Sequence, residues 1–249
     1  MTQDLKSQAA IEFRDVSIVF GPKPERALPL MDQGLDRAEI ERQTGQVMGV
    51  HNCNLSVAEG EVLVLMGLSG SGKSTLLRAV NGLNPLAKGQ VKVSLEGSSL
   101  DIATASPAAL KHLRQRQVAM VFQQFGLLPW RSVRQNVELG LGISAISRAE
   151  RKERVDQHLE LVGLADWADN KIAELSGGMQ QRVGLARALA TQAPILLMDE
   201  PFSALDPLIR ARLQDELLGL QAKLGRTIVF VSHDLDEAFK LGDRIAIME

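Results

Sequence analysis

Residues 67–75 read GLSGSGKST, which matches the phosphate-binding pattern G-x-x-x-x-G-K-[ST]. Glycines at this spacing let backbone N–H groups curl around phosphate oxygens. An apolar run at 61–66 predicts a strand before the loop, and LLRAVNGL at 76–83 predicts a helix whose partly positive N-terminus faces the same anion. Lys73 is expected to reach the β- and γ-phosphates, and the Ser74 hydroxyl is expected to bind Mg²⁺. The residues predicted to hold a nucleotide here are Gly67, Ser69, Gly70, Ser71, Gly72, Lys73, Ser74 and Thr75.

Two further apolar runs also end in chemically active side chains. ILLMDEP at 195–201 places Asp199 and Glu200 after a predicted buried strand, and VFVS at 229–232 is followed by His233. Since ligands of open parallel sheets bind beyond the carboxyl ends of the strands, these groups are expected to meet the glycine loop. We expect Asp199 to hold Mg²⁺, Glu200 to accept a proton from an attacking water, and His233 to contact the γ-phosphate.

Bulk composition is that of an ordinary soluble globular protein. The chain has 249 residues, 45% of them hydrophobic and 23% charged, with a formal net charge of −2. That balance argues against nucleic acid as a partner. The single cysteine, Cys53, excludes an internal disulfide. No apolar run approaches the roughly 18 residues that span a bilayer, and MTQDLKSQAA at 1–10 lacks the apolar core of a signal peptide.

Short alternating segments at 11–20, 47–57 and 91–95 predict a small antiparallel sheet. Between the first two lies an unusual stretch at 22–46. Within it, Asp36 and Glu39 resemble a helix-start capping pair and Gly45 a helix stop, so one or two short surface helices are expected there.

The segment from about 124 to 175 has a helical pattern instead. It contains SRAERKERVDQHLELVGL, in which Ser147 and Glu150 predict a capping box. It also contains the unusually apolar run FGLLPW at 125–130. We hypothesise that this run forms a groove for a short helix of a membrane partner, while core packing of the lobe is an equal alternative for Trp130.

A second anion site is predicted in LSGGMQQRVGLAR at 175–187. Ser176 can cap a helix there, and Gly177 with Gly178 lets a phosphate approach the backbone. The alternative is a core helix that glycines merely begin.

The motifs GLSGSGKST, VFQQ, LSGGMQQR, ILLMDEP, SALD and VSHD occur in this order between Gly67 and Asp234. This combination resembles ABC-transporter ATPases. The resemblance implies an α/β fold: a P-loop RecA-like core with an N-terminal antiparallel β subdomain over 1–123 and 176–249, and an inserted α-helical lobe at 124–175.

The resemblance also implies roles for further residues. Two copies would pair head to tail around ATP and Mg²⁺, so that the run Ser176, Gly177, Gly178 and Gln180 contacts the ATP bound to the partner copy. Gln123 would contact Mg²⁺ and the water and sense the membrane subunit. Asp206 would lie at the interface between copies. Phe20 matches the aromatic residue that stacks on adenine, although many relatives have tyrosine there.

Longer stretches such as MGLSGSGKSTLLRAVNGLNP and VAMVFQQFGLLPWRSVRQNV resemble the quaternary-amine importers of glycine betaine, proline and choline, and LLRAVNGLNP with LLPWRSV is most similar to choline importers. The insertion at 22–46 resembles one in that branch. The implied partners are transmembrane permease subunits and a periplasmic or extracellular solute-binding protein or domain, with the chain at the cytoplasmic face of the inner membrane. The chain ends just after a strand expected at 244–248, which predicts a shortened chain or the core of a longer protein.

Other classes remain alternatives. An ABC ATPase of DNA repair would carry a long coiled coil between Gln123 and Ser176, where the interval is too short. A translation-type ABC protein would need two ATPase modules, and a scaffold would not need Lys73, Glu200 and His233 together. An ATPase of another ABC importer branch is a further alternative, which differs from the quaternary-amine interpretation only in the solute that is imported.

Overall fold

A computed structural model describes residues 9–95, 97–141 and 146–249. Residues 1–8, where the absence of a signal peptide is predicted, and 142–145 of the predicted lobe lie outside this part. The strands are β1 (Ala9–Phe20), β2 (Val47–Ala58), β3 (Val62–Gly67), β4 (Lys88–Leu95), β5 (Ser98–Asp101), β6 (Val118–Val121), β7 (Ile195–Asp199), β8 (Thr227–Val231) and β9 (Arg244–Met248). The α-helices are α1 (Leu28–Asp32), α2 (Arg37–Thr44), α3 (Lys73–Ala79), α4 (Pro107–His112), α5 (Val133–Leu139), α6 (Arg148–Leu161), α7 (Gly177–Ala190), α8 (Pro207–Leu224) and α9 (Leu235–Leu241).

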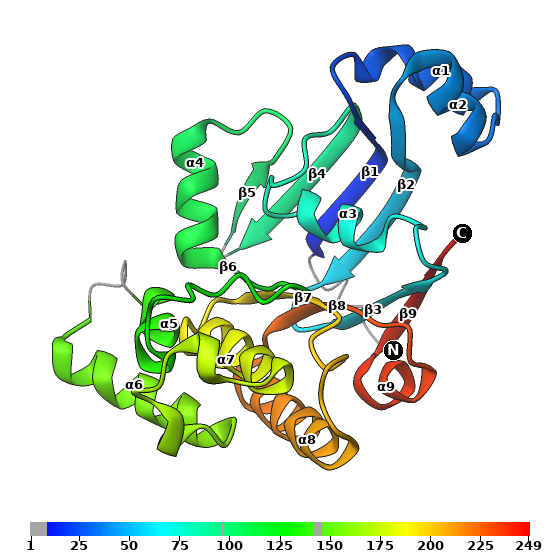
Figure 1. Ribbon diagram of the computed structural model, residues 1–249. Helices are drawn as coiled ribbons and strands as arrows, with labels where there is room; N and C mark the ends of the chain where they lie inside the picture. Colours follow the sequence, from blue (N-terminus) through cyan, green and yellow to red (C-terminus); the bar gives the residue numbers. More distant parts are fainter. Residues whose placement is uncertain (1–8, 96, 142–145) are drawn as a thin grey trace, which may run out of the picture.

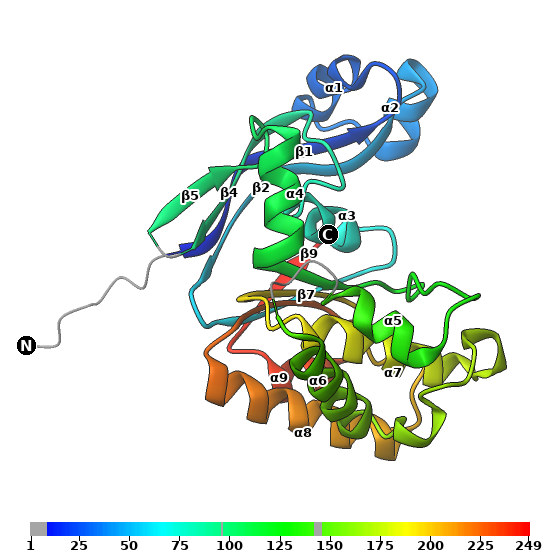
Figure 2. The same ribbon diagram turned by 90° about the vertical axis from the view of Figure 1, so that its left-hand side faces the viewer.

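The central layer is a parallel sheet with the strand order β6-β7-β8-β3-β9. The residues of β7 and β8 are all buried, as their unbroken apolar sequences predict. Because β7, β8 and β3 are neighbours, their carboxyl ends meet at one edge, which confirms the predicted convergence. Helices α7, α8 and α9 cover one face of this sheet (Figures 1 and 2).

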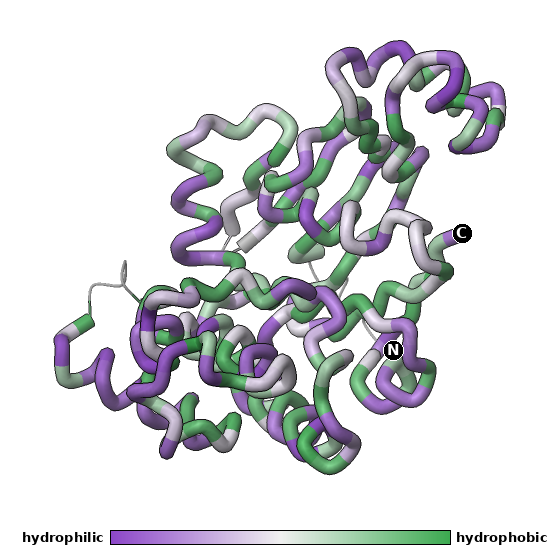
Figure 3. Tube along the Cα trace, in the orientation of Figure 1, coloured by the Kyte–Doolittle hydropathy of each residue, from purple (hydrophilic) through white to green (hydrophobic). Residues whose placement is uncertain are grey.

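The second sheet is antiparallel, with the order β2-β1-β4-β5. Helix α3 lies between the two sheets in both views (Figures 1 and 2). Its Leu76 and Leu77 share a core with Ile11 of β1 and Val229 of β8. Apolar segments correspondingly run through the middle of the molecule, and hydrophilic segments lie at its outer turns (Figure 3). The two sheets, the helix between them and the flanking helices confirm the predicted ABC ATPase fold.

The stretch at 22–46 folds into η1 (Pro24–Arg26), α1 and α2. Asp36 caps α2 by accepting a hydrogen bond from the Glu39 amide, and Gly45 ends the helix with a left-handed backbone, both as predicted. These helices do not lie on the surface alone, because they contribute buried side chains. Ala27, Met31 and Ile40 are buried and form a small core of their own with Val19 of β1.

Helices α5 and α6 lie in the predicted lobe range, with η3 (Ala165–Trp167) and η4 (Ile172–Glu174), whereas the π-helix η2 (Leu113–Gln117) precedes it. The predicted capping box at the start of α6 is only half formed. Ser147 accepts from the Glu150 amide, but the Glu150 carboxylate pairs with Arg154 one turn further on, since this cation competes for it. Within the described residues, no helix is both long and apolar enough to cross a bilayer.

Candidate functional site

The glycine loop follows β3 and leads into α3. Gly67 and Gly72 both have positive φ, at +145° and +98°, a region that favours glycine. A Cβ atom at Gly72 would lie 2.4 Å from the carbonyl oxygen of Gly49 on β2, and one at Gly67 would lie 2.0 Å from that of Met248 on β9. Close packing against β2 and β9 therefore requires glycine at both positions, whether or not a phosphate also approaches the loop backbone.

The Lys73 side chain lies within the loop rather than in solvent. Only 7% of the residue is exposed, and its Nζ donates to the carbonyl oxygens of Gly67 at 2.9 Å and Leu68 at 2.7 Å. The Ser71 hydroxyl lies 3.4 Å from the same nitrogen. The loop thus holds a cation through its own carbonyl and hydroxyl oxygens, and this cation lines the adjoining cleft.

Asp199 at the end of β7 is fully buried, and its carboxylate has two partners. The Ser74 hydroxyl donates to one oxygen at 2.6 Å, and the Arg78 guanidinium bonds the other at 2.9 Å. A hydroxyl and a carboxylate oxygen side by side form the hard-oxygen donor set that Mg²⁺ prefers. Two of the three residues predicted to bind this ion, Ser74 and Asp199, therefore fit it.

Glu200 lies between two of the predicted catalytic side chains. Its Oε2 is 3.4 Å from the Gln123 amide nitrogen and 3.6 Å from His233 Nδ1. Only 22% of its side chain is exposed, against 67% for His233. The carboxylate is thus oriented by two polar neighbours at the rim of the site.

The backbone of Glu200 is in the left-handed region, with φ +48°, which is rare for a residue with a long side chain. Its amide donates to the Val231 carbonyl at 3.1 Å, and its own carbonyl accepts from Gln181 Nε2 at 3.0 Å. Gln181 is buried on α7. Gln181 is not among the residues predicted from the sequence, although it lies in LSGGMQQR about one turn after the two glycines.

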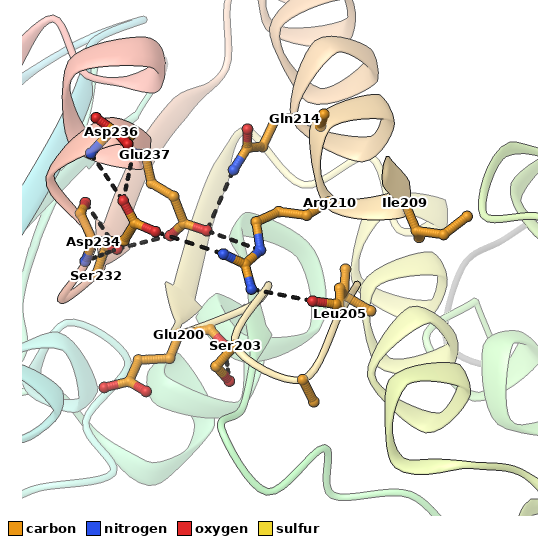
Figure 4. A network of polar contacts seen from close by, with 12 residues as sticks. Glu200, Ser203, Leu205, Ile209, Arg210, Gln214, Ser232, Asp234, Asp236 and Glu237 are labelled. Carbon is orange, nitrogen blue, oxygen red and sulfur yellow. Dashed lines mark hydrogen bonds and ion pairs between the residues drawn. The ribbon is translucent and has the colours of Figure 1, made fainter. Parts of the chain in front are cut away.

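A polar network next to Glu200 joins the starts of α8 and α9 (Figure 4). Arg210 donates to the Leu205 carbonyl at 3.1 Å and forms ion pairs with Asp234 at 3.5 Å and Glu237 at 3.8 Å. Glu237 also accepts from the Ser232 hydroxyl at 2.7 Å. Burial raises the pKa of Glu237, against the lowering influence of Ser232. The network holds the turn carrying His233 against the segment before α8.

A cleft of about 570 Å³ joins these parts. Phe20 lies at the end of β1 and is partly exposed in this cleft, as an aromatic that stacks on a base should be. Arg37 of α2 also lines it, which the sequence analysis did not foresee. Of the predicted residues, the lining includes Phe20, Gly67, Ser69, Gly70, Gly72, Lys73, Ser74, Thr75, Gln123, Glu200 and His233.

Ser71 stays within the glycine loop beside Lys73, whereas the remaining predicted nucleotide contacts lie outside the cleft. Ser176 caps α7, and Asp206 caps α8. Gln180 donates to the carbonyls of Ile172 at 3.2 Å and Leu175 at 3.1 Å. A Cβ atom at Gly178 would lie 2.8 Å from the Ala204 carbonyl oxygen, so close helix packing also requires that glycine. None of the run Ser176 to Gln180, nor Asp206, is among the described residues that line the cleft.

The apolar run at 125–130 is held in place by its neighbours. Arg187 donates to the carbonyls of Phe125 and Gly126, both at 2.7 Å, and burial lowers its pKa. A groove of about 330 Å³ lies beside it, and Gly126 is the one residue of the run among its described lining residues. Trp130 is 70% exposed, so core packing does not explain it.

Comparison with known proteins agrees with this fold. Residues 50–203 match the family model described as ABC transporter, and the chain belongs to that family. It therefore carries a nucleotide-binding domain. It is also similar in structure to the dimeric ATP-binding cassette MJ0796, solved in a post-hydrolysis state bound to ADP and Pi, with a TM-score of 0.81 and 31% identity over 96% of this chain and 94% of that one.

Relatives identified by sequence indicate which branch of the ABC transporter family this chain resembles. The glycine betaine/proline betaine transport system ATP-binding protein ProV of Escherichia coli (strain K12) is 50% identical over 96% of this chain and 59% of its own length. The trimethylamine N-oxide transport system ATP-binding protein TmoW of Ruegeria pomeroyi (strain ATCC 700808 / DSM 15171 / DSS-3) is 49% identical over 96% of this chain and 69% of its own length. The chain thus spans about three fifths of the length of the first of these curated relatives. Their names confirm the predicted resemblance to the quaternary-amine branch.

Proposed function

We propose that this chain is an ATP hydrolase that drives an importer of quaternary amines. One observation carries the hydrolase assignment. The Glu200 carboxylate, oriented by Gln123 and His233, opens on the same cleft as Lys73 and Ser74. A phosphate cradle and a positioned carboxylate at one site are what phosphoryl transfer to water requires.

Each of these side chains has a separate role in the proposed reaction. Lys73 and the loop amides bind the β- and γ-phosphates, while Phe20 stacks on adenine. Ser74 and Asp199, with Gln123, would hold Mg²⁺, which would neutralise phosphate charge. Glu200 orients a water and takes its proton as the oxygen attacks the γ-phosphorus. The bond from that phosphorus to the bridging oxygen breaks, which leaves ADP and inorganic phosphate, and His233 contacts the γ-phosphoryl oxygens.

A phosphate-release assay with the whole chain tests this assignment. We expect Glu200→Gln to bind ATP as the unchanged chain does and to lose turnover by roughly 10²–10⁴-fold, because proton transfer contributes about that much. Glu153→Gln is the control, since Glu153 is an exposed glutamate on α6 remote from the cleft. Turnover by Glu200→Gln at the unchanged rate would remove Glu200 from the mechanism.

The active form that we propose is a head-to-tail pair of copies. The run Ser176 to Gln180 begins a helix with two glycines, a geometry suited to phosphate, yet it does not line the cleft of its own chain. A second copy would bring it onto the bound ATP, with Asp206 at the contact. The solved dimer of the similar cassette supports this arrangement.

The permease subunits of the proposed complex would dock in the groove beside residues 125–130. Leu83 is exposed and lines this groove together with Phe122 and Leu139. With Cys53→Ser as background, Leu83→Cys should cross-link to the membrane subunit in the assembled complex. Leu224→Cys, equally exposed at the end of α8, should not. Equal cross-linking at both positions, or at neither, would reject this docking site.

The named relatives support a proposal for the cargo. Those named for glycine betaine and for trimethylamine N-oxide transport are about equally similar to this chain, and both solutes carry a methylated nitrogen. We assign quaternary amines as the cargo class on these relatives, and choline in particular on the resemblance of LLRAVNGLNP and LLPWRSV to choline importers. The solute would be delivered by a solute-binding protein to permeases whose cytoplasmic face this chain would occupy. Uptake of choline, glycine betaine and proline by the reconstituted complex tests it. ATP-driven uptake of none of the three would refute the cargo class.

A further inference from the structure

Arg37 is the first residue of α2, in the stretch that separates the first two strands. Its guanidinium donates to the carbonyl oxygen of Gly70 in the glycine loop, and a second nitrogen lies 3.4 Å from the carbonyl oxygen of Gly49 on β2. Although α2 is remote from the loop in sequence, the fold places a cation against it.

The two carbonyls locate the guanidinium within the cleft. A Cβ atom at Gly49 would lie 2.9 Å from the Phe20 ring, so this strand residue lies directly under the aromatic side chain. Gly70 belongs to the phosphate cradle. Arg37 thus lies where the base-stacking wall meets the phosphate loop, and it lines the same cleft as Lys73.

Among the residues that the structure describes, no carboxylate neutralises the charge of Arg37. Both of its contacts are neutral carbonyl oxygens, and the ion pairs of the described part of the chain do not include it. Arg42, on the same helix, pairs instead with Glu39 at 2.6 Å on the exposed side. A guanidinium is well suited to a phosphate because its donors match two phosphate oxygens at once.

Helix α2 is held firmly enough to position this side chain. Ile40 anchors it in the small core with Ala27 and Met31. On the preceding helix α1, Asp32 bonds His51 at 3.1 Å and Lys88 at 3.6 Å, which fastens the insertion to β2 and β4. Arg37 therefore belongs to a packed unit rather than to a loose loop.

We propose that Arg37 is a nucleotide-binding residue, and that the insertion supplies a second cation, beside Lys73, to the phosphate chain of the bound nucleotide. This inference rests on the proposed ATP site. Its chemical consequence is selective: Arg37 strengthens binding of ATP and ADP, which carry phosphates, and leaves adenosine unaffected.

Equilibrium displacement of a fluorescent ATP analogue from the whole chain tests it, with ATP, ADP and adenosine as competitors. Arg37→Ala should weaken ATP and ADP by roughly ten- to a hundredfold, because a charge-assisted hydrogen bond is lost. Arg37→Lys should recover part of the loss. Arg37→Gln keeps an amide donor without the charge, and should weaken ATP and ADP binding as alanine does while the melting temperature stays unchanged.

Arg42→Ala is the matched control, because it removes an arginine from the same helix and should leave all three affinities unchanged. ATP binding by Arg37→Ala and Arg37→Gln at unchanged affinity would overturn the proposal, as would an equal loss for adenosine. If the unaltered chain does not bind the ATP analogue at all, the proposed function itself fails, which is a distinct outcome.

Discussion

The Ser74 hydroxyl donates a 2.6 Å hydrogen bond to the Asp199 carboxylate, although the two residues belong to different strand–loop units of the parallel sheet. The bond joins the start of α3 to the end of β7. Its acceptor is fully buried and also pairs with Arg78. One carboxylate therefore both ties the glycine loop to the sheet and offers oxygens for a cation, so its removal should affect stability and Mg²⁺ dependence together.

Asp199→Asn is expected to lower the free energy of unfolding by roughly 1–3 kcal/mol, because Arg78 loses its charged partner next to a buried group. It should also abolish the dependence of ATP affinity on Mg²⁺. Urea unfolding and nucleotide titrations with and without the ion measure the two effects. Asp169→Asn, which breaks an exposed 3.9 Å pair with Arg134, is the control and should change little. A fully stable Asp199→Asn variant would contradict this account.

The glycine loop allows a matched comparison of two glycines. Gly70 and Gly72 both have positive φ, at +83° and +98°, but a Cβ atom would meet open space at Gly70 and the Gly49 carbonyl at Gly72. Gly70→Ala should cost about 1 kcal/mol of stability from backbone strain alone. Gly72→Ala should cost more, because β2 must move as well. Equal midpoints in urea would show that the approach of Gly49 does not constrain the loop.

The network in Figure 4 predicts a pH effect on stability. Burial raises the pKa of the Glu237 carboxyl, with Asp234 adding to this and Ser232, Arg210 and His233 opposing it. In the interval between its ordinary and raised pKa, the folded chain binds more protons than the unfolded one, so stability falls as pH rises. The contribution of Glu237 is therefore complete at acid pH and lost on passing the raised pKa.

Glu237→Gln keeps an uncharged polar group in place of the carboxyl. Its stability relative to the unchanged chain should increase with pH from the acid side of that range to neutrality, as thermal unfolding at a series of pH values will measure. Glu153→Gln, at an exposed position on α6, is the comparison and should give a difference that does not vary in this way. A flat difference for Glu237→Gln would mean that Ser232, Arg210 and His233 offset the effect of burial on the pKa of Glu237.

The head-to-tail pair predicts a dimer that depends on ATP. Light scattering of Glu200→Gln with ATP should show twice the mass of the nucleotide-free chain, since slowed hydrolysis preserves the closed form. Adding Ser176→Arg should return it to the single mass while ATP still binds, because a bulky cation replaces the cap that faces the partner's ATP. Dimers that persist in the double variant would exclude the run at 176–180 from the interface.

Several strands, the glycine loop and one helix cap could be predicted from the sequence, because they depend on local chemistry. Unbroken apolar runs predicted the buried strands β3, β7 and β8, because parallel strands are covered on both faces. Glycine spacing predicted the phosphate loop, and Ser176 predicted the cap of α7. These features depend on neighbours in the chain. The capping box at Ser147 failed for the complementary reason, because Arg154 competes for Glu150.

Contacts between distant segments were decided only by the tertiary structure. Sheet order brings β7 and β8 next to β3, so that Glu200 and His233 reach the glycine loop, while Gln181 of α7 holds Glu200 in its left-handed backbone. Arg37 reaches the Gly70 carbonyl only because the insertion packs on β1 and β2. The sequence determined the loop groups proposed to bind phosphate, since that chemistry resides in single side chains and local turns. Which groups share a cleft was fixed by long-range packing, which no short stretch of sequence encodes.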